Sequence, residues 1–330
     1  MWTTIDGRHS EGELISYKDG EVTLLIDSRE YVFSIDRFIP SDRDYMIAWK
    51  SHIRCGVCKE SIKGDKMQAG DDFYHPNCFS CLVCERPFLN RQSIRKDEWG
   101  GMVHAEHFRK AMSCGACGRF FSKNKALPGQ FLGDGRLSCR SCLKEAVTDL
   151  ATLSKVSDRV RLSISEIGLP RPYGPLSLRL VNQAEMNREL NRAHGRGKLR
   201  GLTITTFRTV AGRSGVSPQT SYSHQVWILS SLPVVECVSV LAHEFGHVWM
   251  NENFIEVSPP AAEGFCNLLA MHALSKEKSK IADVLRKNLE MSDDRVYGKG
   301  FRDMSKRLDQ LGWQGILNDL LSRRRPQSFR

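Results

Sequence analysis

Residues 55–58 read Cys-Gly-Val-Cys, and residues 75–84 read His-Pro-Asn-Cys-Phe-Ser-Cys-Leu-Val-Cys. Sixteen residues separate the first pair of cysteines from His75, and two further residues separate His75 from Cys78. Two residues between ligands let both side chains face one tetrahedral ion around a tight turn, and Gly56 suits that turn. The spacing therefore predicts a structural zinc ion held by Cys55, Cys58, His75 and Cys78.

A second set of ligands starts directly after the first. Cys81-x2-Cys84 is followed after nineteen residues by His104-x2-His107, which predicts a second zinc ion. The short step from Cys78 to Cys81 resembles the LIM domain, in which two zinc knuckles share a short hinge. The resemblance covers Cys55 to about Lys110. It departs from the common pattern in its last pair, which is His-His where Cys followed by Cys, His or Asp is usual.

A separate four-cysteine site follows. Cys114-x2-Cys117 and Cys139-x2-Cys142 stand twenty-one residues apart and predict a third zinc ion. The chain has eleven cysteines and no apparent secretion signal, so its cysteines indicate metal binding rather than disulfides. Closed tetrahedral sites leave no position for a substrate, so all three are interpreted as structural. Cys237 and Cys266 fit no such pattern and are interpreted as buried core residues.

Residues 243–247, His-Glu-Phe-Gly-His, form an H-E-x-x-H motif. The apolar stretch after Pro233 predicts a buried helix, on which His243 and His247 lie one turn apart on the same face. Two imidazoles in that arrangement can bind a catalytic zinc ion, and Glu244 can take a proton from the water that the metal activates.

A catalytic zinc ion needs a third protein ligand. The long form of the motif would have Gly at 250 and His at 253, but Met250 and Asn253 stand there, which excludes that class. Glu263, on a second helix predicted over 261–269 after the break at 258–260, is the best candidate. A glutamate on a following helix is the gluzincin arrangement.

Other residues near the motif leave alternatives open. Glu256 and His272 are weaker competitors for the third ligand position. Asn267, one turn beyond Glu263, is either a partner that orients His243 or His247 or an ordinary polar residue.

The first fifty residues predict a small β module followed by a helix. Polar and apolar residues alternate over 11–18, 21–27 and 30–35, and Ser41 and Asp42 indicate a helix start. The pattern resembles the Sla-type homology module, a small SH3-like barrel. The residues that carry this resemblance are Trp2-Thr3, Asp6-Gly7-Arg8 and Lys18-Asp19-Gly20-Glu21-Val22-Thr23-Leu24. Such a module either binds a peptide or protein or serves as a folded spacer.

Together these features predict a multidomain α+β chain. The expected parts are an SH3-like module over 1–53, a LIM domain over 54–111, a four-cysteine knuckle over 112–145 and a mainly helical zincin-type metallopeptidase domain with a small sheet over 146–330. In the last part we expect a helix over 147–167 and strands over 176–181, 202–207 and 225–229. The strand over 225–229 could offer its edge to an extended substrate.

Most of residues 55–310 resemble the plant DA-one-like family of LIM-containing regulatory peptidases. Beyond the LIM-like region, the resemblance rests on Gly133-Asp134-Gly135-Arg136-Leu137, Cys139–Leu143, Pro175-Leu176, Arg200-Gly201-Leu202, Leu241-Ala242-His243-Glu244 with His247 and Trp249, Glu263-Gly264, and Tyr297-Gly298-Lys299-Gly300-Phe301-Arg302. The resemblance implies a zinc peptidase that cleaves intracellular proteins. It also raises Tyr297 as a hydrogen-bond donor to the developing oxyanion, although a role in fixing the Tyr-Gly turn fits equally.

Charge and composition limit the partners. The chain carries a formal charge of +10, but no long Lys/Arg run is interleaved with aromatic residues, so nucleic acid is not favoured. The sequence indicates neither a signal peptide nor a membrane span and predicts a cytoplasmic protein. Plant relatives carry acidic ubiquitin-interacting helices, whereas residues 1–50 show none, so a ubiquitin link is not supported.

The sequence as a whole predicts a zinc endopeptidase that uses Glu244 as general base and about four zinc ions per chain, one catalytic and three structural. The LIM-like region and the N-terminal module would recruit protein substrates or regulatory proteins. The alternative is a non-catalytic LIM adaptor whose H-E-x-x-H zinc is structural.

Overall fold

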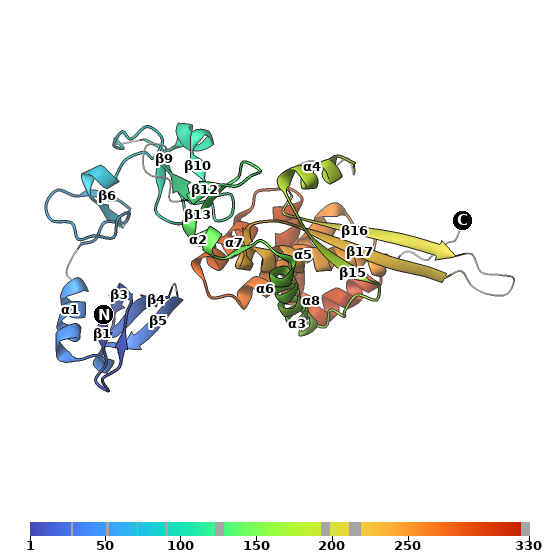
Figure 1. The fold of residues 1–330 in the computed structure, drawn as a ribbon, viewed down its shortest axis with the longest axis horizontal. Coiled ribbons are helices and arrows are strands. Elements are labelled where there is room, and N and C mark those ends of the chain that lie inside the picture. The colour runs from blue at the N-terminus through green and yellow to red at the C-terminus, as the bar shows by residue number, and fades with distance from the viewer. Residues whose placement is uncertain are drawn as a thin grey trace. The chain divides into compact units, whose positions relative to one another are not determined.

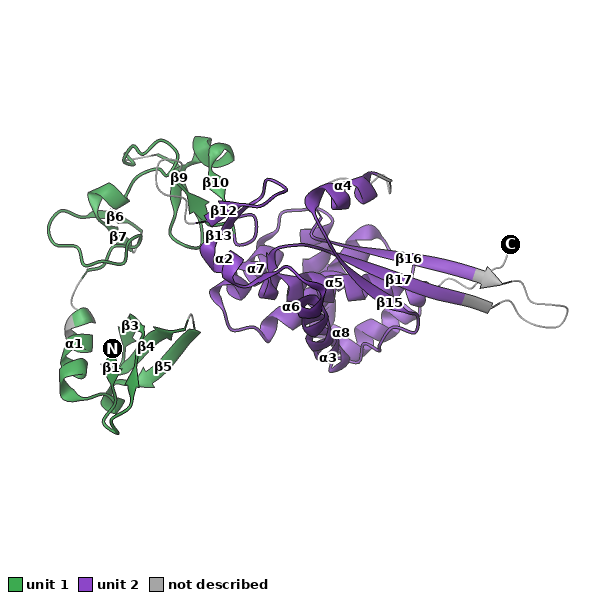
Figure 2. Ribbon diagram, viewed as in Figure 1, with its two compact units in different colours: residues 1–113, 118–127 green, residues 114–117, 128–330 purple. Residues whose placement is uncertain are grey.

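The structure is a computed structural model that describes residues 1–27, 29–50, 53–70, 72–89, 92–122, 129–192, 199–210 and 219–324. It is a mixed α+β chain with several small sheets (Figure 1). The chain divides into two compact units (Figure 2). Unit 1 comprises Met1–Ser113 and Gly118–Leu127, and unit 2 comprises Cys114–Cys117 and Pro128–Arg330. Among the described residues, no helix has both the length and the apolar character needed to cross a membrane.

Unit 1 begins with a small β module. Its elements are β1 (Trp2–Thr3), β2 (His9–Ser10), β3 (Glu13–Lys18), β4 (Glu21–Ile26), β5 (Arg29–Ser34), the 3-10 helix η1 (Ile35–Arg37) and α1 (Pro40–Lys50). β3, β4 and β5 form an antiparallel sheet in that order. One face of the module packs around Trp2, Val22, Leu24 and Met46, which are buried. The strands match the expected ones, and α1 begins one residue before Ser41.

The rest of unit 1 consists of short hairpins. They are β6 (Met67–Ala69) with β7 (Asp72–Tyr74), β8 (Ile94–Lys96) with β9 (Met102–His104), and β10 (Met112–Ser113) with β11 (Phe120–Phe121), together with the 3-10 helices η2 (Pro76–Cys78) and η3 (Ala105–Lys110). Phe79 links the hairpins, because its ring lies 5.1 Å from those of both Tyr74 and Phe88. So small an apolar core needs bound metal to be stable.

Unit 2 opens with the four-cysteine region. It contains β12 (Gly129–Phe131), β13 (Leu137–Cys139), α2 (Arg140–Lys144) and β14 (Ala146–Val147). β14 pairs antiparallel with β18 (Leu232–Pro233), which directly precedes α5 (Val234–Glu252). The four-cysteine region is therefore joined by main-chain hydrogen bonds to the start of the helix that carries the H-E-x-x-H motif.

A three-stranded sheet lies against that helix. β15 (Leu176–Val181), β16 (Gly201–Val210) and β17 (Gln219–Leu229) are arranged in the order β15-β17-β16, with β16 antiparallel and β15 parallel to β17 (Figure 1). The expectation that residues 225–229 offer a sheet edge is wrong, because β17 is the central strand and both of its edges are occupied. The edge strand beside α5 is β16.

The remaining helices enclose the core of unit 2. They are α3 (Leu150–Ser165), α4 (Gln183–Arg192), α6 (Pro259–Ser275), α7 (Lys280–Met291) and α8 (Tyr297–Leu321). The two prolines expected to break the chain instead open α6, where missing N–H groups cost nothing. Gly264 lets α6 approach α8 closely, because a Cβ atom there would lie 2.3 Å from the carbonyl oxygen of Gly300.

Candidate metal centres and active site

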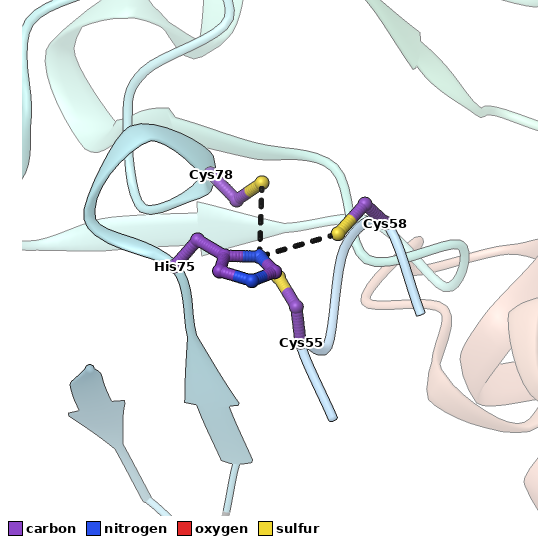
Figure 3. Close-up of side chains that lie close together, drawn as sticks. All are labelled: Cys55, Cys58, His75 and Cys78. Atoms are coloured by element: carbon purple, nitrogen blue, oxygen red, sulfur yellow. Dashed lines mark hydrogen bonds between the residues drawn. The ribbon is translucent and has the colours of Figure 1, made fainter. Parts of the chain in front are cut away.

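The first zinc-knuckle cluster consists of Cys55, Cys58, His75 and Cys78, whose ligand atoms all lie within 4.8 Å of one another (Figure 3). His75 Nδ1 is 3.3 Å from Cys58 Sγ, while its Nε2 is 3.3 Å from the carbonyl oxygen of Ser61. A carbonyl can only accept a hydrogen bond, so Nε2 carries the proton and Nδ1 presents its lone pair to the sulfurs. That tautomer is the one that binds a metal ion.

The second cluster brings together Cys81, Cys84, His104 and His107. His104 is buried, with Nδ1 3.5 Å from Cys84 Sγ and Nε2 3.0 Å from Gln92 Oε1, which repeats the pattern of His75. His107 Nδ1 lies 3.4 Å from Cys81 Sγ. The structure thus places both histidines of the unusual His-His pair beside the cysteines.

Main-chain donors favour thiolates in these knuckles. Burial alone raises the pKa of the Cys81 thiol, but His107 and N–H groups, including those of His104 and Val83, outweigh it and lower the pKa to about 6. The pKa of Cys55 is lowered to about 6 in the same way. Burial and the neighbouring sulfurs of Cys55 and Cys58 raise the pKa of Cys78 to about 12, so in the first knuckle Cys55 is favoured as the thiolate, which is the form that binds metal.

The third cluster lies in unit 2, and all four of its cysteines are buried. It consists of Cys114, Cys117, Cys139 and Cys142. Cys139 caps the N-terminus of α2, with its sulfur accepting a hydrogen bond from the Cys142 N–H at 3.4 Å.

Arg200 connects this cluster to α5. Its guanidinium donates to the carbonyl oxygen of Gly115, inside the cysteine knuckle, and forms an ion pair with Glu236 Oε1 at 2.5 Å. Glu236 lies in the first turn of α5, is 2% exposed, and its Oε2 has no hydrogen-bond partner among the described residues. Burial raises the pKa of Glu236 to about 7, although the positive charge of Arg200 opposes the shift.

The pKa of Glu236 predicts a pH-dependent stability. A carboxyl group with a raised pKa in the folded state stabilises the fold fully below its unfolded pKa of 4.5 and loses this contribution as the pH rises through 7. Glu236→Gln keeps an acceptor for Arg200 but does not titrate. Relative to this variant, wild type should lose about 3 kcal/mol of unfolding free energy between about pH 5 and about pH 8. Urea unfolding of both chains at the two pH values measures this loss. The prediction would be contradicted if wild type and variant differed in unfolding free energy by the same amount at both pH values.

The H-E-x-x-H motif lies on α5, as expected. His243 and His247 face each other with their Nε2 atoms 3.2 Å apart. His243 Nδ1 is 2.9 Å from Asn267 Oδ1, so the Nδ1 proton is donated to Asn267 and Nε2 keeps its lone pair. Asn267 is 6% exposed and reaches His243 from α6, the orienting contact that the sequence left as one of two alternatives.

Glu263 completes a triangle of ligand atoms. Its Oε2 lies 3.1 Å from His243 Nε2 and 3.7 Å from His247 Nε2. Burial raises the pKa of this carboxyl group, but the nearby imidazoles of His243 and His247 outweigh it and hold the pKa at about 2. Two imidazole nitrogens and an ionised oxygen therefore converge on one point, which is a donor set that fits zinc.

The two competitors for the third position lie elsewhere. His272 Nε2 is hydrogen-bonded to the carbonyl oxygen of Ser163 at 3.1 Å, and its ring packs against Trp313. Glu256 lies on the loop between α5 and α6, where it lines a cleft together with His247.

Sequence reasoning missed the relation of Cys266 to this site. Cys266 is fully buried, as expected of a core residue, yet its sulfur lies within 4.8 Å of ligand atoms of both His243 and His247. The helical spacing offered a signal, because Cys266 lies on α6 one turn after Glu263 and next to Asn267.

Glu244 lies between α5 and β16 and is 5% exposed. Its Oε2 accepts a hydrogen bond from Thr203 Oγ1 at 2.7 Å. Gly201 makes room for the other oxygen, since a Cβ atom there would lie 2.5 Å from Glu244 Oε1. Thr203 and Gly201 stand on the same face of β16, and sequence reasoning did not identify either as a partner of Glu244.

Tyr297 stands at the start of α8 with its ring stacked at 6.5 Å from that of His243. Burial and the negative charges of Glu263 and Glu244 raise its pKa to about 12. The phenol therefore stays protonated at neutral pH and can donate a hydrogen bond.

A cleft of about 640 Å³ continues from the site. It is lined by His247, Met250, Asn251 and residues of the loop that follows α5. Of the proposed metal ligands, His247 lines this cleft.

Comparison with known proteins identifies the residues that form the LIM domain. The family model described as LIM domain matches residues 55–100, which cover the first cluster and the two cysteines of the second. A short stretch of 35 residues is 49% identical to human "Actin-binding LIM protein 1", and it covers 11% of this chain and 4% of that protein. No solved structure matches the chain significantly.

Longer matches are to plant proteins. "Protein DA1" of Arabidopsis thaliana is 20% identical over 339 residues, covering 75% of this chain and 63% of that protein. "LIM domain-containing protein HDR3" of Oryza sativa subsp. japonica is 23% identical over 286 residues, covering 68% of this chain and 56% of that protein. The chain thus spans less than two thirds of the length of these curated relatives. It contains a LIM domain and is homologous to the plant LIM-containing proteins of the DA1 type.

Proposed function

We propose that this protein is a zinc-dependent endopeptidase whose active site lies on α5 and α6 of unit 2. The observation that carries the proposal is the convergence of His243 Nε2, His247 Nε2 and Glu263 Oε2 beside Glu244. Hydrolysis of denatured casein by wild type, but not by Glu244→Gln, tests it.

The donor set fits zinc. Two imidazole nitrogens that face each other at 3.2 Å repel through their lone pairs unless a cation or proton lies between them. His243, His247 and Glu263 would hold the ion and leave the further position that catalytic sites keep open. When bound, zinc supplies an electrophile that acidifies water and polarises a peptide carbonyl.

Glu244 is the general base in this proposal. It accepts a proton from the attacking water and passes it to the leaving amine. Its placement supports this role. The Thr203 hydroxyl, which also contacts the Glu244 carbonyl oxygen at 3.1 Å, donates to Oε2, and the main chain of β16 beside Gly201 limits the movement of the carboxylate.

Tyr297 and β16 would bind the substrate. The protonated phenol of Tyr297 can donate to the carbonyl oxygen as negative charge develops there. Among the described residues, β16 pairs with β17 on one edge and with no strand on the other, so an extended peptide can add to that second edge by main-chain hydrogen bonds.

The regions outside the catalytic site would select protein substrates or regulators. The LIM domain supports this role because its closed metal sites leave its surface for protein contacts. We retain the SH3-like interpretation of residues 1–53 and the zincin-type interpretation of residues 146–330 as part of the proposal.

Thr203→Val is expected to lower kcat by about tenfold to 100-fold with little change in KM, because a hydrogen bond to a charged group is lost while the side-chain shape is kept. Thr203→Ser should restore most of the rate. Thr206→Val, on the exposed face of the same strand, is the matched control and should behave as wild type. Equal kcat values for Thr203→Val and wild type on a peptide substrate would remove Thr203 from the mechanism.

A further inference from the structure

A buried pair of ionisable side chains lies close to the site but has no part in the mechanism above. His224 on β17 and Glu252 at the end of α5 are joined by a hydrogen bond of 2.9 Å, and their side chains are 0% and 1% exposed. Burying two such groups costs several kcal/mol unless hydrogen bonds satisfy them, so their partners are informative.

Their partners form one continuous chain of hydrogen bonds. Glu252 Oε1 accepts from the N–H of Gly174 at 2.8 Å as well as from His224 Nε2. On the other side of the ring, His224 Nδ1 lies 3.0 Å from Thr205 Oγ1. Thr205 Oγ1 in turn accepts from Asn251 Nδ2 at 2.9 Å. The chain runs from the buried carboxylate to a side chain that lines the cleft.

The groups at the two ends of this chain have defined roles. The Glu252 carboxylate accepts the hydrogen bond from His224 Nε2. Asn251 Nδ2 donates to Thr205 Oγ1, whichever of Thr205 Oγ1 and His224 Nδ1 carries the proton between them. The NH2 group of Asn251 is thereby held against β16, and its Oδ1 accepts no hydrogen bond from the residues that the structure describes.

Asn251 occupies a position that a substrate would reach. It lies one helical turn beyond His247, and both residues line the cleft of about 640 Å³. Each main-chain N–H of a bound peptide needs an acceptor when it loses water. On one face of β16, Thr203 holds the catalytic carboxylate and Thr205 holds Asn251, so the same strand positions both groups.

We propose that Asn251 Oδ1 accepts a hydrogen bond from a main-chain N–H of the substrate peptide, and that Thr205, His224 and Glu252 are positioning residues that hold it in this orientation. The inference rests on the proposed peptidase function and specifies one contact to the peptide main chain.

The test uses a short synthetic peptide spanning a casein bond that wild type cleaves, and a set of analogues in which each N–H in turn is replaced by an ester oxygen. For wild type, one replacement outside the scissile bond should raise KM about fivefold to tenfold. Asn251→Ala should show a similarly raised KM with the unmodified peptide. Replacing that one N–H by an ester oxygen should not raise the KM of this variant further. Every other ester should affect both chains equally.

Further variants separate orientation from folding. Thr205→Val should weaken the response to the same ester, and Thr205→Ser should restore it. Asn187→Ala changes an exposed asparagine of α4 that lies outside the cleft and the hydrogen-bond chain, and it should keep the wild-type pattern. Calorimetric binding of the same peptides to Glu244→Gln gives a second readout that does not depend on turnover.

The outcomes separate the proposed Asn251 contact from the proposed peptidase function. If wild type cleaves the peptides and Asn251→Ala keeps the wild-type response to every ester, the contact is refuted while the peptidase function stands. If wild type neither cleaves nor binds the peptides, both are refuted.

Discussion

A chain carrying His247→Ala is expected to bind three zinc ions where wild type binds four, and to lose measurable peptide hydrolysis. The four ions correspond to the four clusters of ligand atoms in the described chain. His247 belongs to the α5 cluster with His243 and Cys266, and its Nε2 also lies 3.7 Å from Glu263 Oε2. Without His247 a single imidazole remains, so the two-histidine site that holds the ion is lost. Native mass spectrometry of the intact chain counts the ions directly.

A matched histidine controls for helix disruption. His272 lies on α6 with its ring bonded to a main-chain carbonyl and belongs to none of the four clusters. His272→Ala should therefore keep four zinc ions and its activity. Four ions in the folded His247→Ala chain would place the fourth ion outside α5 and contradict the proposed site.

Cys142→Ala is expected to unfold much of unit 2, including the active-site helix. Cys142 is fully buried, and its cluster is joined to α5 through the β14–β18 pair and through Arg200. Structural zinc contributes about 10–16 kcal/mol of binding free energy in small zinc-finger peptides, which matches or exceeds the whole stability of a typical domain. Thermal unfolding followed by circular dichroism, with zinc content, should show loss of one ion and of the cooperative transition of unit 2.

Cys237→Ala separates metal loss from cavity formation. Cys237 is a fully buried cysteine of α5 outside the four clusters. Its replacement should cost about 1–2 kcal/mol and leave the zinc content unchanged. If Cys142→Ala melts like Cys237→Ala, the four-cysteine site does not support the catalytic helix.

The sequence predicts the ligand pairs within the metal clusters because each pair comes from one local turn or from one turn of α5. Spacing of two residues in the knuckles, and of one turn on α5, sets the geometry with little help from the rest of the fold. Asn267 could be proposed for the same reason, because it follows Glu263 on one helix.

Strand order and the contacts of Glu244 could not be predicted in this way. Five alternating residues reveal a strand over 225–229 but not its neighbours, and the structure places it in the centre of the sheet. Thr203 meets Glu244 across 41 positions of sequence, and Thr205 meets His224 through the register of β16 with β17. Such contacts depend on tertiary packing, which produces no periodic pattern of residue types in the sequence of either segment.

The measurement that tests the central claim most directly is casein cleavage by wild type and Glu244→Gln, with zinc counted in both. We expect four zinc ions in each chain and new peptide termini only with wild type, since a general base accounts for about 10²–10⁴ in rate. Equal cleavage by the two chains would remove Glu244 from catalysis. Four zinc ions without cleavage by wild type would contradict the peptidase and favour a non-catalytic LIM adaptor.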